Sequence, residues 1–510
     1  MLTEEINVRT IPALLDFCQT RYGSRCAFRW RAGAEIHDVT YQQFAGQVRT
    51  LAAYIAAQTA RDDRIALVGG NSYRWLLGWF AVVCAGRVSV PIDPQLPTGD
   101  ILALLAKSGA SLLLHAAEFG DVAAAAPRAM DLERLPVEGE ADGWPCAVQP
   151  EDLGAIVFTS GTTGVPKGVL LTHWNFMADA LSGCRCMDLA GHTMLAVLPF
   201  HHTLSLTPGM LAQLPGGSTV CICGGMRQLT KDLAAFQPEY TVAVPLLAEG
   251  MYRKIWDTAQ KEGKEKLLRV LLRCSDALLR LGIDLRRKLF KSVLDACGGL
   301  KWMLVGGAPL SAECADGFLR FGLEVLPAYG VSECAPGVAL NRSGACKSQS
   351  VGQVLDCCRV KIVDGEIWVK GDNVSQGYYQ DEAATQEAFT QDGWHKTGDL
   401  GLLDADGYLY ITGRRKNLIV LRNGKNVSPE GLEQKLTELP CVQEALVYQE
   451  GDEIVAELYL DTEERPDAEA QFVAALAQLN RQLPAYQRIT KHKLRDAEFP
   501  KTTTKKIIRK

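Results

Sequence analysis

The feature that most constrains this 510-residue chain is the segment from Ile156 to Val169, which reads IVFTSGTTGVPKGV. An apolar run leads into a loop of hydroxyls and glycines, and Lys167 closes the loop. Glycine lets a backbone approach a ligand closely, while hydroxyl and N–H groups supply donors. The loop therefore predicts a polyphosphate site, although Pro166 and Gly168 on either side of Lys167 exclude the common P-loop pattern. A polar surface loop is the alternative, and the length of the motif argues against it.

The segment resembles the phosphate-binding signature of the adenylate-forming superfamily, which includes acyl-CoA synthetases, adenylation domains of peptide synthetases and beetle luciferases. Further resemblances follow in the superfamily's order along nearly the whole chain. They imply an α/β protein with a large N-terminal domain of helix-covered mixed β-sheets, residues 1–413, which binds ATP and the acyl group. A small α+β C-terminal lobe, residues 414–510, follows with its hinge near Lys416. The resemblance assigns the ATP phosphates to Thr159, Ser160, Gly161, Thr162, Thr163, Gly164 and Lys167.

Length and composition agree with a cytoplasmic enzyme of at least two domains. The chain is too long for one compact core, and its 47% apolar and 22% charged residues are ordinary for a globular enzyme. A net charge of −5 gives no reason to expect a nucleic-acid partner. The longest apolar run, Leu76 to Ala85, is too short to span a bilayer. The 16 cysteines form no Cys-x-x-Cys pair, which favours buried reduced thiols.

The N-terminal part predicts a parallel sheet covered by helices. Residues 64–68 are expected to form a buried strand, residues 72–85 a helix and residues 88–92 a second strand. This βαβ pattern argues for a mostly parallel sheet. Residues 116–152 are rich in Ala, Gly and Pro and predict a loosely structured connection.

Two adjacent histidines, His201 and His202, follow Leu198-Pro199-Phe200. Neighbouring side chains diverge on a strand or helix, and no acidic or sulfur partner is near in sequence, so the pattern argues against a metal site. The resemblance places His202 in the carboxylate pocket and gives it a catalytic role, whereas the family usually has an aromatic residue at the position of His201. Two solvent-facing histidines are the alternative.

The same segment bears on the substrate. Family members that take amino acids carry an aspartate at the position of His201, because an ammonium group in a dry pocket needs a carboxylate. A substrate without an amine is therefore favoured. A set of apolar residues follows and can either line an aliphatic tunnel or pack in the core, which is the commoner fate: Leu204, Leu206, Met210, Leu211 and Leu214.

A helical insertion spans residues 250–299. From Met251 to Leu300 it contains 12 Lys and Arg residues against 6 acids, and its leucines keep roughly helical spacing. Such a helix can lie on an anionic membrane surface, or it can pack its leucines inward and leave its charges in water. A similar insertion is typical of long-chain acyl-CoA synthetases.

Two later motifs resemble the adenine and metal segments of the family. A predicted strand, residues 301–305, ends in a Gly-Gly-Ala-Pro turn, and ligands bind beyond the carboxyl ends of such strands. In the segment Ala328 to Glu333, the resemblance stacks Tyr329 on adenine, lets Ser332 donate to a phosphate and gives Glu333 to Mg²⁺, which needs only one or two carboxylates. The other nucleotide-binding residues implied here are Gly307, Ala308, Pro309 and Gly330.

The last motifs lie at the join and in the tail. Asp399 matches the ribose-binding aspartate of the family, Arg414 matches the arginine that reaches ribose and phosphate, and Lys416 occupies the hinge position. Lys506 matches the catalytic lysine by its spacing from Pro500. Lys505 replaces the usual glycine before it and is the alternative cation.

The predicted activity has two steps that use ATP, Mg²⁺ and coenzyme A. A carboxylic acid, expected to be a medium- or long-chain fatty acid, forms acyl-AMP and pyrophosphate, and coenzyme A then takes the acyl group and releases AMP. The alternatives are a ligase that loads an acyl carrier protein or another acceptor and, more weakly, a non-catalytic nucleotide-binding relative. The expected location is the cytoplasm, with peripheral membrane contact through residues 251–300 as one reading.

Overall fold

The computed structural model describes residues 6–139, 141–159, 166–422, 424–439, 441–451, 453–462, 467–501 and 507–509. Several residues assigned from the sequence lie outside these ranges, and they are Ser160, Gly161, Thr162, Thr163, Gly164, Lys505 and Lys506.

A six-stranded sheet forms the N-terminal part of the molecule. Its strands β3 and β4 are short apolar runs that are almost completely buried, as expected of parallel strands covered on both faces. All neighbours pair in parallel except β7 and β8, which form an antiparallel pair. In spatial order the strands are β6 (Ala129–Asp131), β5 (Leu112–His115), β3 (Arg64–Val68), β4 (Val88–Ile92), β7 (Leu153–Thr159) and β8 (Lys167–Thr172).

A nine-stranded sheet forms the centre. Its six middle strands, from β13 to β1, are parallel. At one edge β2 pairs antiparallel with β1, and at the other β14 and β15 continue the sheet in antiparallel pairs. In spatial order the strands are β15 (Gln353–Val354), β14 (Gly337–Leu340), β13 (Glu324–Gly330), β12 (Trp302–Val305), β11 (Tyr240–Ala243), β9 (Thr193–Ala196), β10 (Thr219–Ile222), β1 (Cys26–Ala32) and β2 (Glu35–Thr40).

Three smaller sheets complete the fold. An antiparallel sheet contains β16 (Cys358–Val363), β17 (Glu366–Gly371), β18 (His395–Leu403) and β19 (Leu409–Arg414). The C-terminal lobe contains a pair, β20 (Ile419–Val420) and β21 (Asn426–Val427), and a sheet of β22 (Val442–Glu450), β23 (Glu453–Leu460) and β24 (Lys491–Arg495). A hydrophobic cluster drawn only from residues 419–489 gives this lobe a core of its own.

Helices cover the sheets, and their starts follow from local sequence. Ser72 caps α3 and Thr172 forms a capping box with Asn175 at the start of α6, so both helices begin directly after a hydroxyl residue. The helices are α1 (Ile11–Tyr22), α2 (Tyr41–Ala56), α3 (Tyr73–Cys84), α4 (Thr98–Ser108), α5 (Gly120–Ala125), α6 (His173–Met187), α7 (Thr203–Leu206), α8 (Leu229–Phe236), α9 (Pro245–Lys261), α10 (Glu265–Arg280), α11 (Arg286–Leu289), α12 (Lys291–Ala296), α13 (Ala312–Phe321), α14 (Glu382–Ala388), α15 (Pro429–Thr437) and α16 (Ala468–Gln482).

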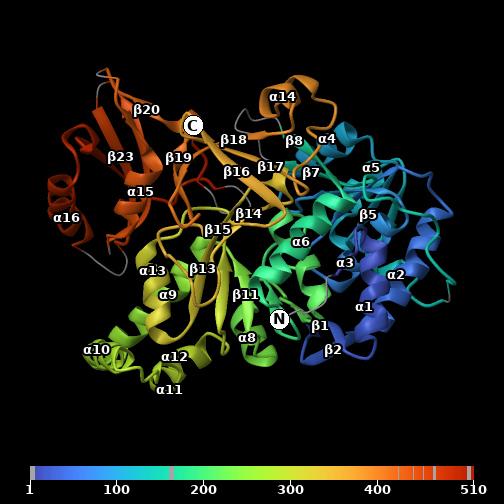
Figure 1. Cartoon of the computed structure of the whole chain (residues 1–510), viewed down its shortest axis with the longest axis horizontal. Coiled ribbons are helices and arrows are strands. Elements are labelled where there is room, and N and C mark those ends of the chain that lie inside the picture. The colour runs from blue at the N-terminus through green and yellow to red at the C-terminus, as the bar shows by residue number, and fades with distance from the viewer. Residues whose placement is uncertain are drawn as a thin grey trace.

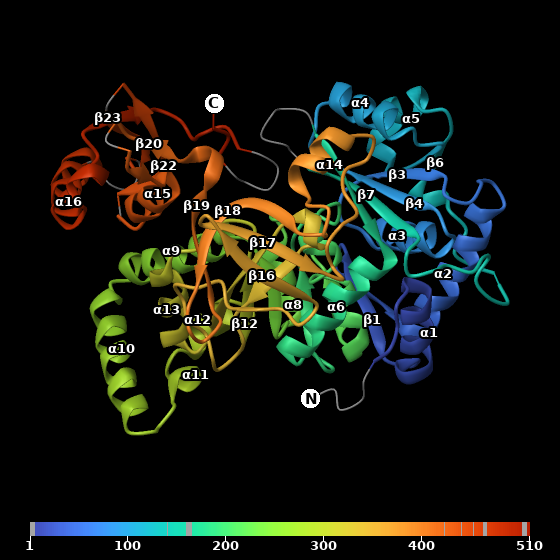
Figure 2. The ribbon, with the colours of Figure 1, turned by 45° about the horizontal axis from the view of Figure 1, so that its top comes forward.

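The C-terminal lobe and the N-terminal helices α1 to α5 lie on opposite sides of the molecule, with the central sheet between them (Figure 1). Helices α10 and α11 project from the body below the C-terminal lobe, and Figure 2 shows the same projection from a second direction. The insertion predicted at residues 250–299 is therefore helical, as expected.

One expectation about the N-terminal part of the chain was wrong. Residues 116–152 are not merely a loose connection, because β6 adds a parallel strand to β5.

The apolar set that follows His202 mostly takes the commoner of its two expected fates, which is core packing. Of this set, only Leu204 borders the large cavity of the molecule. The other four are completely buried in the core, and they are Leu206, Met210, Leu211 and Leu214.

Candidate functional site

The carboxyl ends of four parallel strands bring the predicted motifs together. β9, β11, β12 and β13 are neighbours in the central sheet, so the segments that follow them meet at one edge. A continuous cavity of about 3820 Å³ opens there and extends to the C-terminal lobe. Of the residues assigned from the sequence, those that line it are Thr159, Lys167, His202, Gly307, Ala308, Pro309, Tyr329, Gly330, Ser332, Glu333, Asp399, Arg414 and Lys416.

Asp399 is buried and contacts two partly exposed polar side chains. It accepts a hydrogen bond of 2.7 Å from the Tyr329 hydroxyl, and its other oxygen is 2.7 Å from Nε of Arg414. Burial, together with the Asp399 charge, raises the pKa of Tyr329, so its hydroxyl remains a donor. Burial of Arg414 disfavours its charge, but the Asp399 carboxylate outweighs this and raises the pKa of the guanidinium. The predicted adenine and ribose residues are thus in direct contact.

Glu333 and Lys167 are connected through Tyr378, which the sequence analysis missed. The Tyr378 hydroxyl donates to Glu333 Oε1 at 2.7 Å, and Lys167 Nζ lies 5.0 Å from the centre of the Tyr378 ring. Thr159 pairs with Lys167 across β7 and β8, so this pair closes the phosphate loop at its base. No local motif marks Tyr378 in the sequence, because its partners lie far along the chain.

A buried polar network holds the segment that carries Tyr329 and Glu333. Asp179 of α6 accepts the Gly337 N–H at 3.2 Å. The Asn373 amide donates to the carbonyls of Cys334 and Gly337 at 3.0 and 2.6 Å, and Thr207 donates to the carbonyl of Ala335. Burial raises the pKa of Asp179 to about 7, and the Gly337 hydrogen bond only partly offsets this. These side chains fix the backbone turn at Glu333 and were not identified from the sequence.

His201 and His202 have an acidic neighbour, contrary to the expectation from sequence. Asp93, which follows β4, places Oδ2 3.5 Å from His201 Nε2. The sequence argument considered only nearby residues, whereas the two sheets bring these segments together. The two imidazole rings are 4.0 Å apart between centroids. The next residue, Thr203, places its hydroxyl 3.5 Å from that of Ser332, so the histidines lie beside the predicted phosphate site.

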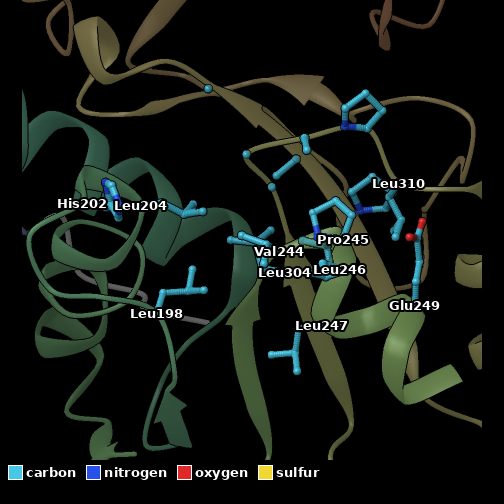
Figure 3. A pocket seen from close by; sticks show the side chains of 18 of the residues that line it. Leu198, His202, Leu204, Val244, Pro245, Leu246, Leu247, Glu249, Leu304 and Leu310 are labelled. Carbon is cyan, nitrogen blue, oxygen red and sulfur yellow. The ribbon is translucent and has the colours of Figure 1, made fainter. Parts of the chain in front are cut away.

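The cavity continues past Leu204 into an apolar part between the central sheet and the insertion. Figure 3 shows His202 and Leu204 on one side of this part and Leu247, Glu249 and Leu310 on the other. The Glu249 carboxylate accepts the Ser311 N–H at 3.3 Å, and burial raises its pKa. The apolar residues of α9, α10 and α12 that border the cavity are Pro245, Leu246, Leu247, Met251, Ile255, Ala259, Leu267, Leu268, Leu271, Val293 and Ala296.

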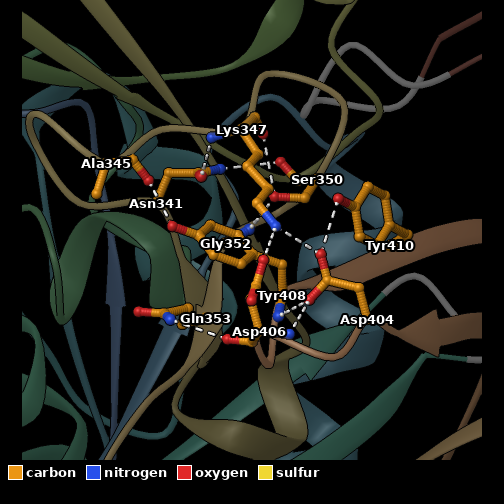
Figure 4. Close-up of polar contacts among 10 residues, drawn as sticks. All are labelled: Asn341, Ala345, Lys347, Ser350, Gly352, Gln353, Asp404, Asp406, Tyr408 and Tyr410. Atoms are coloured by element: carbon orange, nitrogen blue, oxygen red, sulfur yellow. Dashed lines mark hydrogen bonds and ion pairs between the residues drawn. The ribbon is translucent and has the colours of Figure 1, made fainter.

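A braced loop, residues 341–353, forms another part of the wall. Lys347 Nζ is 2.7 Å from carboxylates of both Asp404 and Asp406 in the turn between β18 and β19 (Figure 4). The Tyr408 hydroxyl donates to the Ala345 carbonyl at 2.7 Å. Because these contacts hold the middle of the loop, its residues 348–351 border the cavity in a defined position.

Lys416, the predicted hinge residue, lies in a short 3₁₀ turn between Arg414 and the lobe. Burial, and then the charge of Arg414, lower the pKa of Lys416. The residue before it contacts the N-terminal part of the chain, because Arg415 pairs with Glu366 of β17 at 2.8 Å. The residue after it contacts the C-terminal lobe, because Asn417 donates to Glu430 of α15 at 2.6 Å. Lys416 thus stands at the join of the two parts of the chain.

The tail on either side of residues 502–506 borders the same cavity. Lys501 pairs with Ile507 in an antiparallel bridge, and the Ile508 N–H donates to the Pro500 carbonyl at 2.9 Å. Arg509 pairs with Glu433 of α15 and donates to the Val447 carbonyl at 3.1 Å. Burial raises the pKa of Glu433 to about 7, although Arg509 opposes this. The residues on either side of the predicted catalytic lysine are therefore anchored at the cavity, while Lys506 itself lies outside the described residues.

Comparison with known proteins places the chain in a family. Its residues 16–379 match the model of the AMP-binding enzymes and residues 416–510 that of the AMP-binding enzyme C-terminal domain. The chain belongs to the AMP-binding enzyme family. It is 32% identical to long-chain-fatty-acid–CoA ligase FadD15 of Mycobacterium bovis over 80% of this chain and 75% of that protein, and 33% identical to mouse long-chain-fatty-acid–CoA ligase 6 over 61% and 48%.

The fold is also similar to that of solved structures. The solved structure of o-succinylbenzoate CoA synthetase from Bacillus subtilis, in complex with its acyl-adenylate, superposes with a TM-score of 0.77 over 98% of this chain and 97% of that one, at 23% identity. The predicted adenylate-forming fold is confirmed, and so is the enzyme class, an AMP-forming acid–thiol ligase, for which ATP and coenzyme A are the typical substrates. Within the described ranges, no helix has both the length and the apolar character needed to cross a membrane.

Proposed function

We propose that this enzyme activates a medium- or long-chain fatty acid to acyl-AMP and then transfers the acyl group to coenzyme A. The observation that carries the proposal is the apolar extension of the cavity under α9, α10 and α12. Aliphatic side chains border it on several sides, and the Glu249 carboxylate is engaged by the Ser311 N–H. The 32% identity to a mycobacterial long-chain-fatty-acid–CoA ligase supports the same substrate class.

In the first step, the acid's carboxylate attacks the α-phosphorus of ATP and pyrophosphate leaves. The chain positions the reactants and neutralises charge, which is how phosphoryl chemistry is accelerated. We assign adenine to Tyr329, ribose to Asp399 and phosphate contacts to Lys167 and Arg414. The substrate carboxylate lies beside His202, and Lys506 meets the charge that develops at the α-phosphate.

The Glu333 carboxylate suits Mg²⁺, because this ion keeps most of its waters and takes one or two carboxylates together with phosphate oxygens. Mg²⁺ neutralises phosphate charge when it is bound with ATP. The Tyr378 hydroxyl holds one oxygen of Glu333, so the carboxylate is oriented toward the cavity before substrate arrives. In the second step, the coenzyme A thiol attacks the acyl carbonyl and AMP leaves.

A panel of acids tests the substrate class. Each buried methylene contributes about 0.8 kcal/mol, so kcat/KM should rise about threefold to fourfold per carbon until the cavity is full. Pyrophosphate release is measured for straight-chain acids from acetate to stearate, with benzoate and an amino acid as controls. If acetate, benzoate or the amino acid is used better than octanoate and longer acids, the proposal fails.

The acceptor is tested separately with preformed acyl-AMP. Coenzyme A is expected to be acylated faster than a holo acyl carrier protein at equal concentration. Faster loading of the carrier protein would instead support the alternative that this ligase serves a carrier.

Peripheral membrane contact is a further part of the proposal. On α10 and the turn after it, Val270 and Leu281 are 53% and 75% exposed, in a segment with 12 basic and 6 acidic residues. Exposed apolar groups among basic ones favour an anionic lipid surface. Sedimentation with vesicles should show binding to anionic but not zwitterionic lipid, and Leu281→Glu should weaken it.

A further inference from the structure

Three side chains with metal-binding atoms meet beside the predicted carboxylate pocket. They are Asp93, His201 and His202, and one ligand atom of each lies within 4.8 Å of those of the others. Adjacent side chains diverge in a regular strand or helix. Neither histidine lies in a strand or helix, since both occupy the turn between β9 and α7. Their rings can therefore lie only 4.0 Å apart between centroids.

His201 gives a second, independent reason to expect a ligand. Its side chain is only 6% exposed, and Nε2 makes no hydrogen bond with any residue of the described ranges. A buried polar atom without a hydrogen bond destabilises the folded state, because it has lost its contact with water. This nitrogen lies 3.5 Å from Asp93 Oδ2, itself on a side chain that is 11% exposed. A cation between the two would give the His201 nitrogen a partner, and all three side chains border the cavity through which it can enter.

We infer that Asp93, His201 and His202 form a binding site for a divalent transition-metal ion, best matched by Zn²⁺. Two imidazoles and one carboxylate are the ligand set of zinc sites that keep a fourth position open. Mg²⁺ prefers oxygen ligands, so the site differs in kind from the carboxylate of Glu333. The fourth position faces the cavity, where water or a substrate carboxylate can fill it.

An ion at this site would affect substrate binding, an inference that rests on the proposed function. His202 adjoins Thr203, whose hydroxyl is 3.5 Å from that of Ser332 at the predicted phosphate site. An ion held here occupies the place assigned to the acid's carboxylate. Zn²⁺ is therefore expected to compete with the fatty acid.

Direct binding of Zn²⁺ tests the site without catalysis. The parent protein is the full chain with Cys274→Ser, because Cys274 is an exposed thiol that could itself bind Zn²⁺. Zn²⁺ is titrated into it by calorimetry in the presence of excess Mg²⁺. Asp93→Asn and His201→Phe should each weaken the binding of one Zn²⁺ by at least about tenfold. Loss of a residue that only supports a metal ligand already lowers metal affinity by about that factor. His192→Gln is the matched control, because His192 pairs with Glu239 at 2.7 Å outside this cluster.

Co²⁺ identifies the ligands by their spectrum. The parent protein should show d–d bands without a thiolate charge-transfer band, and Asp93→Asn should lose the d–d bands. Unchanged Zn²⁺ affinity in both Asp93→Asn and His201→Phe, or a thiolate band, would overturn the site.

Kinetics test the competition separately. Zn²⁺ should raise the apparent KM for the acid in the parent protein and not in Asp93→Asn. Zn²⁺ binding that depends on Asp93 but leaves acid kinetics unchanged would refute the competition and the place given to the carboxylate, while the ion site itself would stand.

Discussion

At the residue scale, the nucleotide end of the site depends on two carboxylates with different surroundings. Asp399 is held by Tyr329 and Arg414, and Glu333 by Tyr378. Asp399→Ala removes a charged hydrogen-bond acceptor worth about 1.5–3 kcal/mol, so the KM for ATP should rise about 10- to 100-fold. Glu333→Ala removes a metal ligand and should lower kcat about 10²- to 10³-fold. Steady-state kinetics at rising Mg²⁺ separate the two, because only Glu333→Ala should be partly rescued. Equal rescue of both would show that the roles are misassigned.

Asp179 makes a prediction about pH and stability. Burial raises its pKa to about 7, against about 3.9 in an unfolded chain. The folded state therefore binds the Asp179 proton more tightly than the unfolded state does. This proton binding stabilises the fold fully below the pKa of the unfolded chain, and the stabilisation is lost as the pH rises through about 7. Between pH 5 and pH 8 this loss is roughly 2 to 3 kcal/mol.

Asp179→Asn keeps an acceptor for the Gly337 N–H and has no proton to lose. The variant should gain stability relative to the wild type by that amount as the pH rises, measured by urea unfolding at both pH values. The thiols of Cys334 and Cys357 lie near Asp179 and are common to both proteins, and their pKa values are raised, so they stay protonated at both pH values. An identical pH dependence of the two proteins would mean that Asp179 is ionised throughout.

At the scale of the element, α9 sets how much room an acyl chain finds. Gly250 borders the cavity, and a Cβ added there meets no atom within 4 Å. Gly250→Phe should therefore fold well, since replacing a mid-helix glycine generally favours the helix, and its ring should occupy part of the cavity. The preferred acid is expected to become shorter by several carbons, with activity on the shortest accepted acids preserved.

The matched control is Gly46→Phe. Gly46 also lies in a helix, α2, and an added Cβ there likewise meets no atom within 4 Å, but it does not border the cavity. The acid panel, read by pyrophosphate release, should be unchanged in this variant. A shift of chain length in both variants, or in neither, would contradict the placement of the acyl chain along α9.

Elements were easier to predict than contacts between them. The strands β3 and β4 and the helix between them follow from local apolar pattern, and the structure has them at the expected residues. The insertion was expected to be helical, but the sequence did not reveal which of its leucines are buried. Leu268 and Leu272 are buried because they pack against residues of α9 and α13, whereas Leu267 and Leu279 are exposed. Asp93 and Tyr378 were missed because each meets its partners only after separate sheets have packed together.

At the scale of the whole molecule, the two parts of the chain meet across the cavity, and few polar contacts join their described residues. Gln434 of α15 donates to the Leu310 carbonyl at 3.2 Å, while Arg415 and Asn417 bind on opposite sides of Lys416. The residues after this join pack around a core of their own. We propose that residues 414–510 rotate as a body about Lys416 between adenylation and thioester formation, since a lobe with its own core can move without unfolding.

Rotation would bring Lys506 to the site in one pose only. Removing a charge that meets a developing transition state costs about 3 to 4 kcal/mol, or about 10²–10³ in rate. Lys506→Ala should lose ATP-dependent adenylation by that factor, yet turn over preformed acyl-AMP and coenzyme A near the wild-type rate. Lys416→Pro should do the reverse, because proline restricts the backbone at the hinge. Pyrophosphate release measures the first half-reaction, and acyl-CoA formation from acyl-AMP measures the second.

The matched control for this pair is Lys505→Ala, which removes the neighbouring cation of the same tail. If Lys505→Ala loses adenylation while Lys506→Ala retains it, the catalytic role belongs one residue earlier. If Lys506→Ala slows both half-reactions equally, the lysine serves both poses or supports the lobe's structure. The alternation is then wrong for this enzyme, and the anchored residues Lys501, Ile507 and Arg509 act as a fixed wall of the site.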